Sequence, residues 1–180
     1  MKEKIKKFCT IASLVLLVGC GYTTGSLLPT HFKKICVDSF INKIDVSREF
    51  SDKRGYEMYR SGLESDITRA VIDRFIFDGN LSVVKADDAD LLMKGELVYF
   101  TKEPLRYDNY DNIEEYRVVV SVNVELEDAS TGKILWREEG FTGEYTYRTT
   151  GTLAASEESA LSGAVEDLAK RLVEKTVEGW

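Results

Sequence analysis

The chain has 180 residues, a length typical of one folded domain, and carries 24 Lys and Arg against 31 Asp and Glu, for a net charge of −7. This acidic balance excludes general binding to nucleic acid, because an anionic surface repels an anionic polymer. The single histidine, His31, argues against the Ser-His-Asp and Cys-His sites of many hydrolases.

The first 20 residues have the features of a bacterial lipoprotein signal. Four lysines precede an apolar run at 11–18, which is shorter than the roughly 20 residues that a membrane-spanning helix needs. The run ends in Leu17-Val18-Gly19-Cys20, which resembles a lipobox, whose cysteine thiol receives diacylglycerol. We therefore expect cleavage of residues 1–19, lipid attachment to Cys20, a tether at 20–31 and a single domain at 32–180. The alternative is a chance cysteine behind an ordinary secretory signal.

The residues around the lipobox also bear on location and redox state. Gly21, rather than Asp, follows Cys20, which favours the outer membrane where the enteric sorting rule holds. Cys9 would leave with the signal and Cys20 would become a thioether, so Cys36 would have no partner for an intrachain disulfide. Cys36 lies in a strand-like run, and we expect it to be a small buried hydrophobe.

Hydrophobic periodicity predicts the elements of the domain. In chain order they are a strand at 32–40, a helix at 55–78, a short strand at 81–85, strands at 91–100, 114–127 and 134–147, and a helix at 153–177, with loops at 41–54 and 101–112 and a hairpin at 128–133. The clearest strand is 114–127, in which Val118, Val120 and Val122 alternate with mostly polar residues, Val119 being the one exception. We predict an α+β fold, with two helices packed on one face of a mixed, mostly antiparallel four-stranded sheet.

Several glycines predict local features of this fold, and one group of apolar residues does not fit its main apolar stripe. Gly95 in a strand marks a bulge or a close backbone approach, and Gly140 and Gly143 predict a bend in the last strand. Asp78-Gly79 predicts the end of the first helix. On that helix, Ile72, Phe75 and Ile76 fall opposite the main apolar stripe. Either neighbouring strands cover them, or they form an exposed patch for a partner.

The motifs of common enzymes and metal sites are missing from the sequence. It contains no G-x-S-x-G, P-loop or CxxC motif. The three aspartates at 87, 88 and 90 lack the spacing, glycine and distal glutamate of a calcium loop. We expect no catalytic residues, no metal and no cofactor, although counting carboxylates cannot exclude a glycosidase pair.

The expected strand order brings three cations to one end of the sheet. If the three long strands run antiparallel, the loop 101–112 and the exit of the last strand meet at the same end. Lys102, Arg106 and Arg148 should then cluster, among Tyr107, Tyr110 and Tyr147. Cations beside aromatic rings suit a phosphorylated glycolipid or the carbonyls of a partner. The alternative is ordinary solvated loop charge.

A set of short motifs, in this order and spacing, resembles the LptE family of lipopolysaccharide-assembly lipoproteins. The motifs are Cys20-Gly21-Tyr22, Leu28-Pro29, Asp78-Gly79, Ala89-Asp90-Leu91 with Gly95, Glu115-Tyr116-Arg117-Val118 and Thr131-Gly132-Lys133-Ile134-Leu135-Trp136. Together they cover nearly all of the chain after the signal. One departure is Asp38-Ser39, which stands where the family often has a proline, while Phe40-Ile41-Asn42 keeps the rest of that motif.

The resemblance implies an outer-membrane lipoprotein that plugs the lumen of the β-barrel translocon LptD and helps insert lipopolysaccharide into the outer leaflet, without catalysis. It also implies that basic residues contact lipopolysaccharide. No motif assigns their positions, so we expect Arg106, Arg148 and Lys102 from the loops that should meet. The candidate barrel contacts are Ile72, Phe75 and Ile76 on the helix, and Arg117 and Asn123 on the solvated sheet face.

Three other functions share some of these features. A lipoprotein scaffold or activator of another envelope complex, such as a cell-wall synthase or a secretion pore, would have the same anchor and domain size. A periplasmic binding module would need a single deep pocket. An enzyme would need a cleft with two close, desolvated carboxylates.

Overall fold

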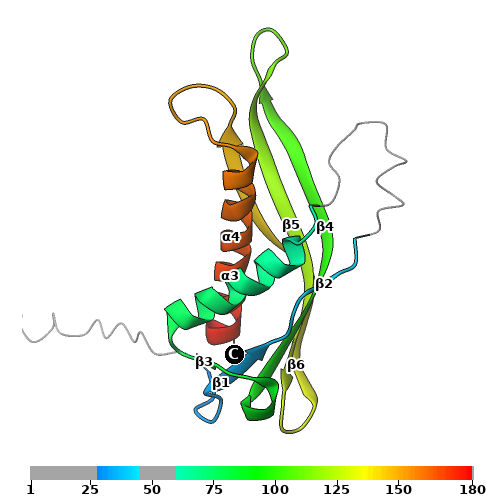
Figure 1. Cartoon of the computed structure of the whole chain (residues 1–180), viewed down its shortest axis with the longest axis vertical. Helices are drawn as coiled ribbons and strands as arrows, with labels where there is room; N and C mark the ends of the chain where they lie inside the picture. The colour runs from blue at the N-terminus through cyan, green and yellow to red at the C-terminus, as the bar shows by residue number, and fades with distance from the viewer. Residues whose placement is uncertain (1–27, 45–59, 180) are drawn as a thin grey trace, which may run out of the picture.

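A computed structural model describes residues 28–44 and 60–179 (Figure 1). The predicted signal, Cys20, most of the tether and residues 55–59 of the expected first helix lie outside the described residues. The elements are β1 (Lys34–Val37), β2 (Ile41–Asn42), α3 (Leu63–Asp78), β3 (Ser82–Val83), the short 3-10 helix η1 (Ala86–Asp88), β4 (Leu91–Tyr107), β5 (Ile113–Asp128), β6 (Lys133–Arg148) and α4 (Glu157–Glu178).

The strands form one mixed sheet of six, in the order β3-β1-β4-β5-β6, with β2 pairing on β4. β1 is parallel to β3 and β4, and β2 is parallel to β4, whereas β4, β5 and β6 are antiparallel neighbours. The α+β class is confirmed, but the expectation of a mostly antiparallel four-stranded sheet is wrong. The expected first strand at 32–40 contains β1, and the expected short strand at 81–85 contains β3. β2 lies in the stretch expected as loop, because a two-residue strand is too short to give a period-two pattern.

Both helices lie over one face of the sheet and share a single core with it (Figure 1). The strand β5, which lies between β4 and β6, contributes a row of buried side chains: Val118, Val120, Val122, Val124 and Leu126. α4 covers this row with Leu168 and Leu172, which are also fully buried. Burying each such side chain contributes about 1.5–3 kcal/mol, so this layer is the main source of stability.

Helix α3 differs from its prediction in two ways. It begins at Leu63, after Gly62 in the left-handed conformation (φ 94°), so a continuous helix from residue 55 is wrong. Its buried stripe is Leu63, Ile67, Val71 and Phe75. Phe75 is fully buried and Ile72 is half-buried against the core, so the expectation of an exposed patch there holds for Ile76 alone. The predicted end of the helix is confirmed: Gly79 has φ 76° and donates to the carbonyl of Phe75 at 3.0 Å.

The hairpin of β4 and β5 is longer than predicted and extends beyond the N-terminus of α4 (Figure 1). Residues 101–107, expected as loop, continue β4, and only 108–112 form the turn. Pro104 obscured the pattern in the sequence. It is tolerated because β4 pairs only with β5 in this region of the described sheet, and because the ladder shifts register after Pro104.

The turn at the hairpin tip is held by one carboxylate. Asp108 accepts backbone hydrogen bonds from Tyr110 at 2.7 Å and from Asn112 at 2.9 Å. The Asn112 side chain also donates to Asp108 at 2.9 Å. These hydrogen bonds, led by those from Asn112, lower the pKa of Asp108, so the turn keeps its anion at neutral pH.

The free edge of β6 is protected by α4. Asp167 accepts a hydrogen bond from the backbone N–H of Glu144 at 3.1 Å, and Arg171 donates to the carbonyl of Thr142 at 2.6 Å. These side chains occupy backbone groups that could otherwise pair with another strand. Further along β6, the register shifts at Gly140 (φ 65°), whose N–H donates to the Asn123 side chain at 2.9 Å, which confirms the predicted bend.

At two other positions, glycine is needed because a neighbouring group lies too close to leave room for a Cβ atom. A methyl group on Gly95 would overlap the buried ring of Phe40, which confirms the expectation of a close approach at this strand position. A methyl group on Gly143 would lie 2.5 Å from the backbone nitrogen of Leu168, so Gly143 lets β6 and α4 come into direct contact.

Gly143→Ala should lower the free energy of unfolding by about 1–3 kcal/mol, because the added methyl would meet the backbone of α4, which cannot move independently of the core. Gly163→Ala is the matched control. Its methyl would also lie 2.5 Å from a neighbour, but this neighbour is Cδ2 of the partly exposed Tyr145 ring. The ring can turn away, and alanine favours a helix over glycine by about 1 kcal/mol. Urea denaturation followed by circular dichroism should rank Gly143→Ala as the less stable variant, and the reverse order would contradict this packing account.

Candidate functional site

Arg106 and Arg148 lie on one row that crosses three strands at the hairpin end of the sheet. Arg106 on β4 is the register partner of Glu115 on β5, and Glu115 is the partner of Arg148 on β6. Strand spacing places the two arginine Cα atoms roughly 10 Å apart, on either side of Glu115. The expected juxtaposition of these two arginines is confirmed, and we call Arg106, Glu115 and Arg148 the arginine–glutamate row.

The two arginines of the row differ in their partners. Arg106 Nη2 lies 2.7 Å from Glu115 Oε2, and Arg106 Nε lies 3.5 Å from Glu114 Oε2. Arg148 is exposed, and within residues 28–44 and 60–179 its side chain has no hydrogen-bond or ion-pair partner. Its backbone is nevertheless fixed, because its carbonyl accepts from Ala155 at 3.0 Å and the next residue, Thr149, donates to Glu114 at 3.0 Å.

Lys102, which was expected in the same cluster, lies on the other face of the sheet. It pairs with the buried Val118 in the ladder, and its Nζ lies 2.7 Å from Glu157 at the start of α4. The ammonium also lies 4.7 Å from the centre of the Tyr116 ring, which stacks on Tyr147. Lys102 therefore connects β4 to α4, and its side chain is only 13% exposed.

A register shift separates Lys102 from Arg106. With regular alternation, residues 102, 104 and 106 would share a face. The ladder pairs Pro104 with Tyr116 and Arg106 with Glu115, so Leu105 is an extra residue that has no partner of its own. This irregularity moves Arg106 to the face opposite the helices, where Glu115 lies. Sequence reasoning placed all three cations in a loop and could not distinguish the two faces.

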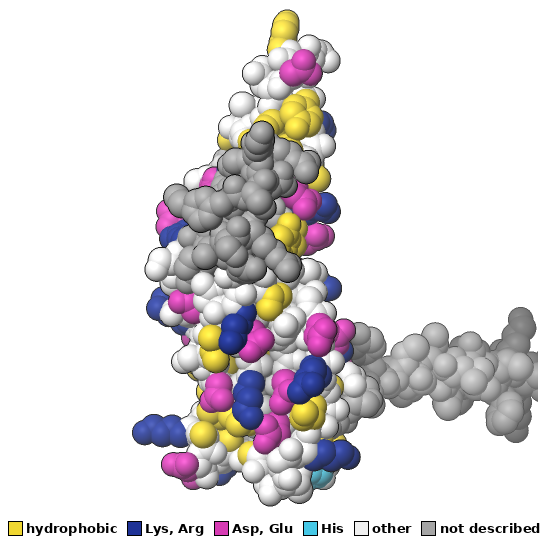
Figure 2. All heavy atoms as spheres, turned by 90° about the vertical axis from the view of Figure 1, so that its right-hand side faces the viewer, with side chains coloured by type: hydrophobic (Ala, Val, Ile, Leu, Met, Phe, Trp, Pro, Cys, Tyr) yellow, Lys and Arg dark blue, Asp and Glu magenta, His cyan; other side chains and the backbone are white. Residues whose placement is uncertain are grey.

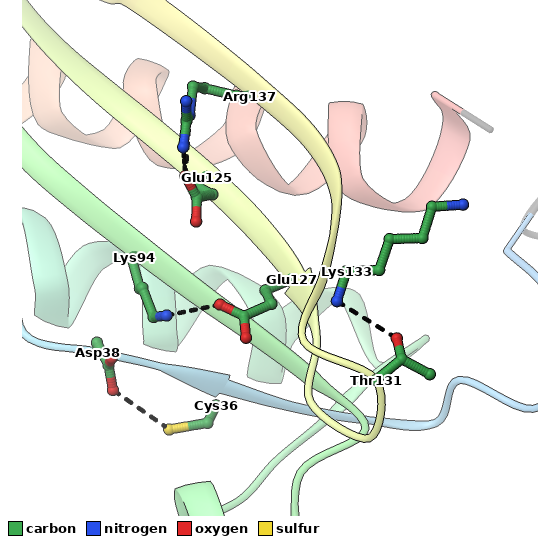
Figure 3. Close-up of polar contacts among 8 residues, drawn as sticks. All are labelled: Cys36, Asp38, Lys94, Glu125, Glu127, Thr131, Lys133 and Arg137. Carbon is green, nitrogen blue, oxygen red and sulfur yellow. Dashed lines mark hydrogen bonds and ion pairs between the residues drawn. The ribbon is translucent and has the colours of Figure 1, made fainter.

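The face of the sheet opposite the helices, which we call the open face, carries cross-strand ion pairs. Arg117 lies 3.0 Å from Glu103 and 3.7 Å from Glu144. Lys94 pairs with Glu127 at 2.6 Å and Arg137 pairs with Glu125 (Figure 3). The hydrogen bond that Lys94 donates to Glu127 is the main cause of the raised pKa of Lys94, and the hydrogen bond that Arg137 donates to Glu125 is the main cause of the raised pKa of Arg137. Basic and acidic side chains are interspersed in the view of Figure 2, as such pairing requires.

Arg117 and Asn123 have structural roles on this open face. Arg117 joins β4 and β6 through its two carboxylate partners, and Asn123 accepts the hydrogen bond from the Gly140 bulge. Cys36, at the edge of the same region, lies 3.9 Å from Asp38 (Figure 3). It is buried, as expected, and this burial together with Asp38 raises the pKa of the thiol, so Cys36 stays protonated at neutral pH.

Exposed apolar side chains gather at two places. At the hairpin end of the molecule, Tyr110 is 86% exposed and Leu153 is 75% exposed. At the C-terminal end of α3, Ile76 is 63% exposed and Phe77 is 80% exposed, with the Arg74 guanidinium 5.2 Å from the centre of the Phe77 ring. Sequence reasoning missed Phe77, whose exposure follows from its position just outside the buried stripe of α3.

Two hollows in the surface of the described residues are large enough to hold a small molecule. A groove of about 700 Å³ between α3 and α4 has Leu161 and Val165 among its lining residues, and Arg60 crosses it to Glu158 at 3.2 Å. A hollow of about 610 Å³ on the open face lies beside Lys94 and Arg137, which are already paired. Within residues 28–44 and 60–179, no three His, Cys, Asp or Glu side chains gather in a way that could hold a metal ion. Neither helix of these residues has the length and apolar character that a membrane crossing requires.

Comparison with solved structures supports the fold. Protein XCC0632 from Xanthomonas campestris superposes with a TM-score of 0.52 at 13% identity, covering 86% of this chain and 92% of its own. The hypothetical protein CT253 from Chlamydia trachomatis gives 0.50 at 11% identity, covering 82% and 97%. The uncharacterized lipoprotein B from Nitrosomonas europaea gives 0.49 at 16% identity, covering 83% and 84%. At these identities the first two likenesses concern the fold alone.

The family comparison covers most of the chain. No curated protein sequence matches it at a significant level. The model of the LptE family, described as lipopolysaccharide-assembly, matches residues 32–176, which include every described helix and strand apart from the last residues of α4. This match agrees with the resemblance found in the sequence motifs. The chain therefore belongs to the LptE family of lipopolysaccharide-assembly proteins.

Proposed function

We propose that this protein is a lipid-anchored outer-membrane component of lipopolysaccharide assembly, which associates with an LptD-like β-barrel and contacts lipopolysaccharide through Arg106 and Arg148. The family match supports the assembly role. The observation that supports the contact is that a partly exposed Arg106 and an exposed Arg148 flank Glu115 on one row of the sheet, and that the Arg148 side chain has no partner among residues 28–44 and 60–179. The role is one of binding and assembly, without catalysis.

The chemistry of lipid A fits this end of the molecule. Its phosphates are anions that guanidinium groups bind through paired hydrogen bonds. Exposed apolar side chains lie near the arginine–glutamate row: Leu105 and Tyr107 on β4, Tyr110 at the tip and Leu153 after β6. An amphiphile with phosphates and acyl chains could contact both kinds of group. Lys102 is outside this proposal, because it faces α4 and pairs with Glu157.

The burial of residues on α3 revises the set of residues that we propose to contact the barrel. Phe75 is buried and Ile72 is half-buried, so the helix contributes Ile76 and its neighbour Phe77. Two adjacent exposed apolar side chains suit a packed protein interface better than contact with water. Arg117 and Asn123 remain candidate contacts on the open face, although the hydrogen bonds that they already make give them a structural role as well.

The membrane anchor is tested directly by mass spectrometry of protein isolated from membranes. We expect the N-terminal peptide to begin at Cys20 and to carry acyl chains, because the lipobox directs both modification and cleavage there. Cys20→Ser should abolish the acyl mass and leave the protein uncleaved or soluble. An unmodified peptide that begins elsewhere would contradict the lipoprotein assignment and leave an ordinary secretory signal.

Arg106→Ala combined with Arg148→Ala should weaken lipopolysaccharide binding by tenfold or more, since two charge-assisted contacts are lost and about 1.4 kcal/mol corresponds to tenfold. The measurement is a fluorescence titration of the full-length protein in detergent. The matched control is Lys94→Ala combined with Arg137→Ala, which removes two cations from the open face at the other end of the strands. Equal losses in the two double variants would show that net charge, rather than this row, governs binding.

Lys102→Met serves as a second comparison. It should leave lipopolysaccharide binding near the wild-type value while lowering stability, because it removes the contacts with Glu157 and the Tyr116 ring. A large loss of binding in a folded Lys102→Met protein would show that the helix-facing side of the sheet belongs to the site.

Detergent extraction of the tagged full-length protein should recover a large outer-membrane β-barrel in stoichiometric amount. Ile76→Ser combined with Phe77→Ser should reduce this recovery severalfold without unfolding the domain, since both side chains are exposed. Ile41→Ser, at another exposed apolar residue, is the control. Recovery of the protein alone, or with a cell-wall synthase or a secretion pore, would overturn the barrel assignment. Equal recovery in all variants would exclude the end of α3 as the contact.

A further inference from the structure

We propose that Glu115 competes with the phosphates of the ligand for Arg106 and thereby limits the affinity of the site. This inference rests on the proposed function of Arg106 and Arg148. In this proposal a carboxylate, and not a further cation, controls how strongly the site holds an anionic headgroup.

The geometry puts Glu115 at the centre of the site. It is the cross-strand partner of both arginines, so it lies between them on the same face. Its carboxylate accepts from Arg106 Nη2 at 2.7 Å, and Glu114 lies 3.5 Å from Nε of the same guanidinium. On Arg106, Nη2 already donates to Glu115 and Nε lies within ion-pair distance of Glu114, so a phosphate that takes the Nε–Nη2 edge of the guanidinium must displace Glu115.

The charges around Arg106 also weaken the binding of a phosphate. Arg106 and Arg148 contribute two positive charges, and Glu114 and Glu115 contribute two negative charges, so the local net charge is zero. A phosphate that approaches the row meets the repulsion of Glu115 as well as the attraction of the arginines. Because the side chains of this row are partly exposed, these opposing terms are each modest and sensitive to salt.

Such a balance suits a protein that must release the lipid it contacts. An unopposed pair of arginines would hold a bisphosphorylated lipid tightly, and release would be slow, because affinity differences appear mainly in dissociation rates. Glu115 restores the Arg106 ion pair as the lipid leaves, so part of the binding free energy is recovered within the protein. The contact then remains selective for phosphate without becoming permanent.

The test compares Glu115→Gln with Glu125→Gln in the full-length protein in detergent, titrated with purified lipopolysaccharide that carries bisphosphorylated lipid A. Both glutamates lie on β5, face the open side and pair with an arginine of a neighbouring strand, and both variants raise the net charge by one. Glu115→Gln should bind about three- to tenfold more tightly than wild type at low ionic strength, as expected for removal of one like charge near the phosphate. Glu125→Gln should bind like wild type.

Two further readouts make the inference specific. The gain in Glu115→Gln should shrink as ionic strength rises, because it comes from exposed charges that salt screens. Glu114→Gln should tighten binding less than Glu115→Gln, since its carboxylate is farther from Arg106. It also provides an independent variant of the same site.

The outcomes separate this inference from the proposed function. If Arg106→Ala with Arg148→Ala weakens binding, but Glu115→Gln and Glu114→Gln leave it unchanged or weaker, the role of Glu115 is overturned and the site stands. Equal tightening in Glu115→Gln and Glu125→Gln would attribute the effect to overall charge and would also overturn it. If the double arginine variant binds like wild type, the site itself is wrong and the inference falls with it.

Discussion

β5 pairs with β4 on one side and with β6 on the other over most of its length, and its strict alternation organises the rest of the domain. On one face, four valines (Val118, Val120, Val122 and Val124) and Leu126 are buried under α4. On the other face, Glu115, Arg117 and Glu125 pair with charges from both neighbours. Because side chains in a strand alternate with period two, a register change of one residue would exchange these faces. The core and the polar surface are therefore specified by the same strand.

The same constraint explains why a local irregularity has a chemical consequence. The extra residue at Leu105 shifts the β4 ladder, so Arg106 joins Glu115 on the open face while Lys102 stays with Tyr116 on the helix side. One bulge thus separates a cation that stabilises the α4 contact from a cation that is available, in part, to solvent. Bulges that redirect a side chain are common next to functional sites, and here the bulge decides which residues belong to the candidate site.

Much of this architecture could be predicted from the sequence, and the failures have physical reasons. The β5 alternation, the Gly79 helix end and the meeting of Arg106 with Arg148 all follow from local patterns and antiparallel topology. The strand β2, the face of Lys102 and the burial of Phe75 do not, because each depends on tertiary pairing. Phe75 continues the four-residue spacing of Leu63, Ile67 and Val71. A choice between competing stripes on α3 requires knowledge of which face meets the sheet.

Arg148 differs from the other cations of the open face in a way that favours it as an anchor for an anion. Lys94, Arg106, Arg117 and Arg137 each have a carboxylate partner, whereas the Arg148 side chain has none among the described residues. Its backbone is held by the return of the chain at Ala155 and by the Thr149 hydrogen bond to Glu114. Binding would then order one side chain and no segment of backbone, which keeps the entropic cost small. Arg148 can therefore bind phosphate without first breaking an ion pair to the described residues, whereas Arg106 must exchange Glu115 for the phosphate.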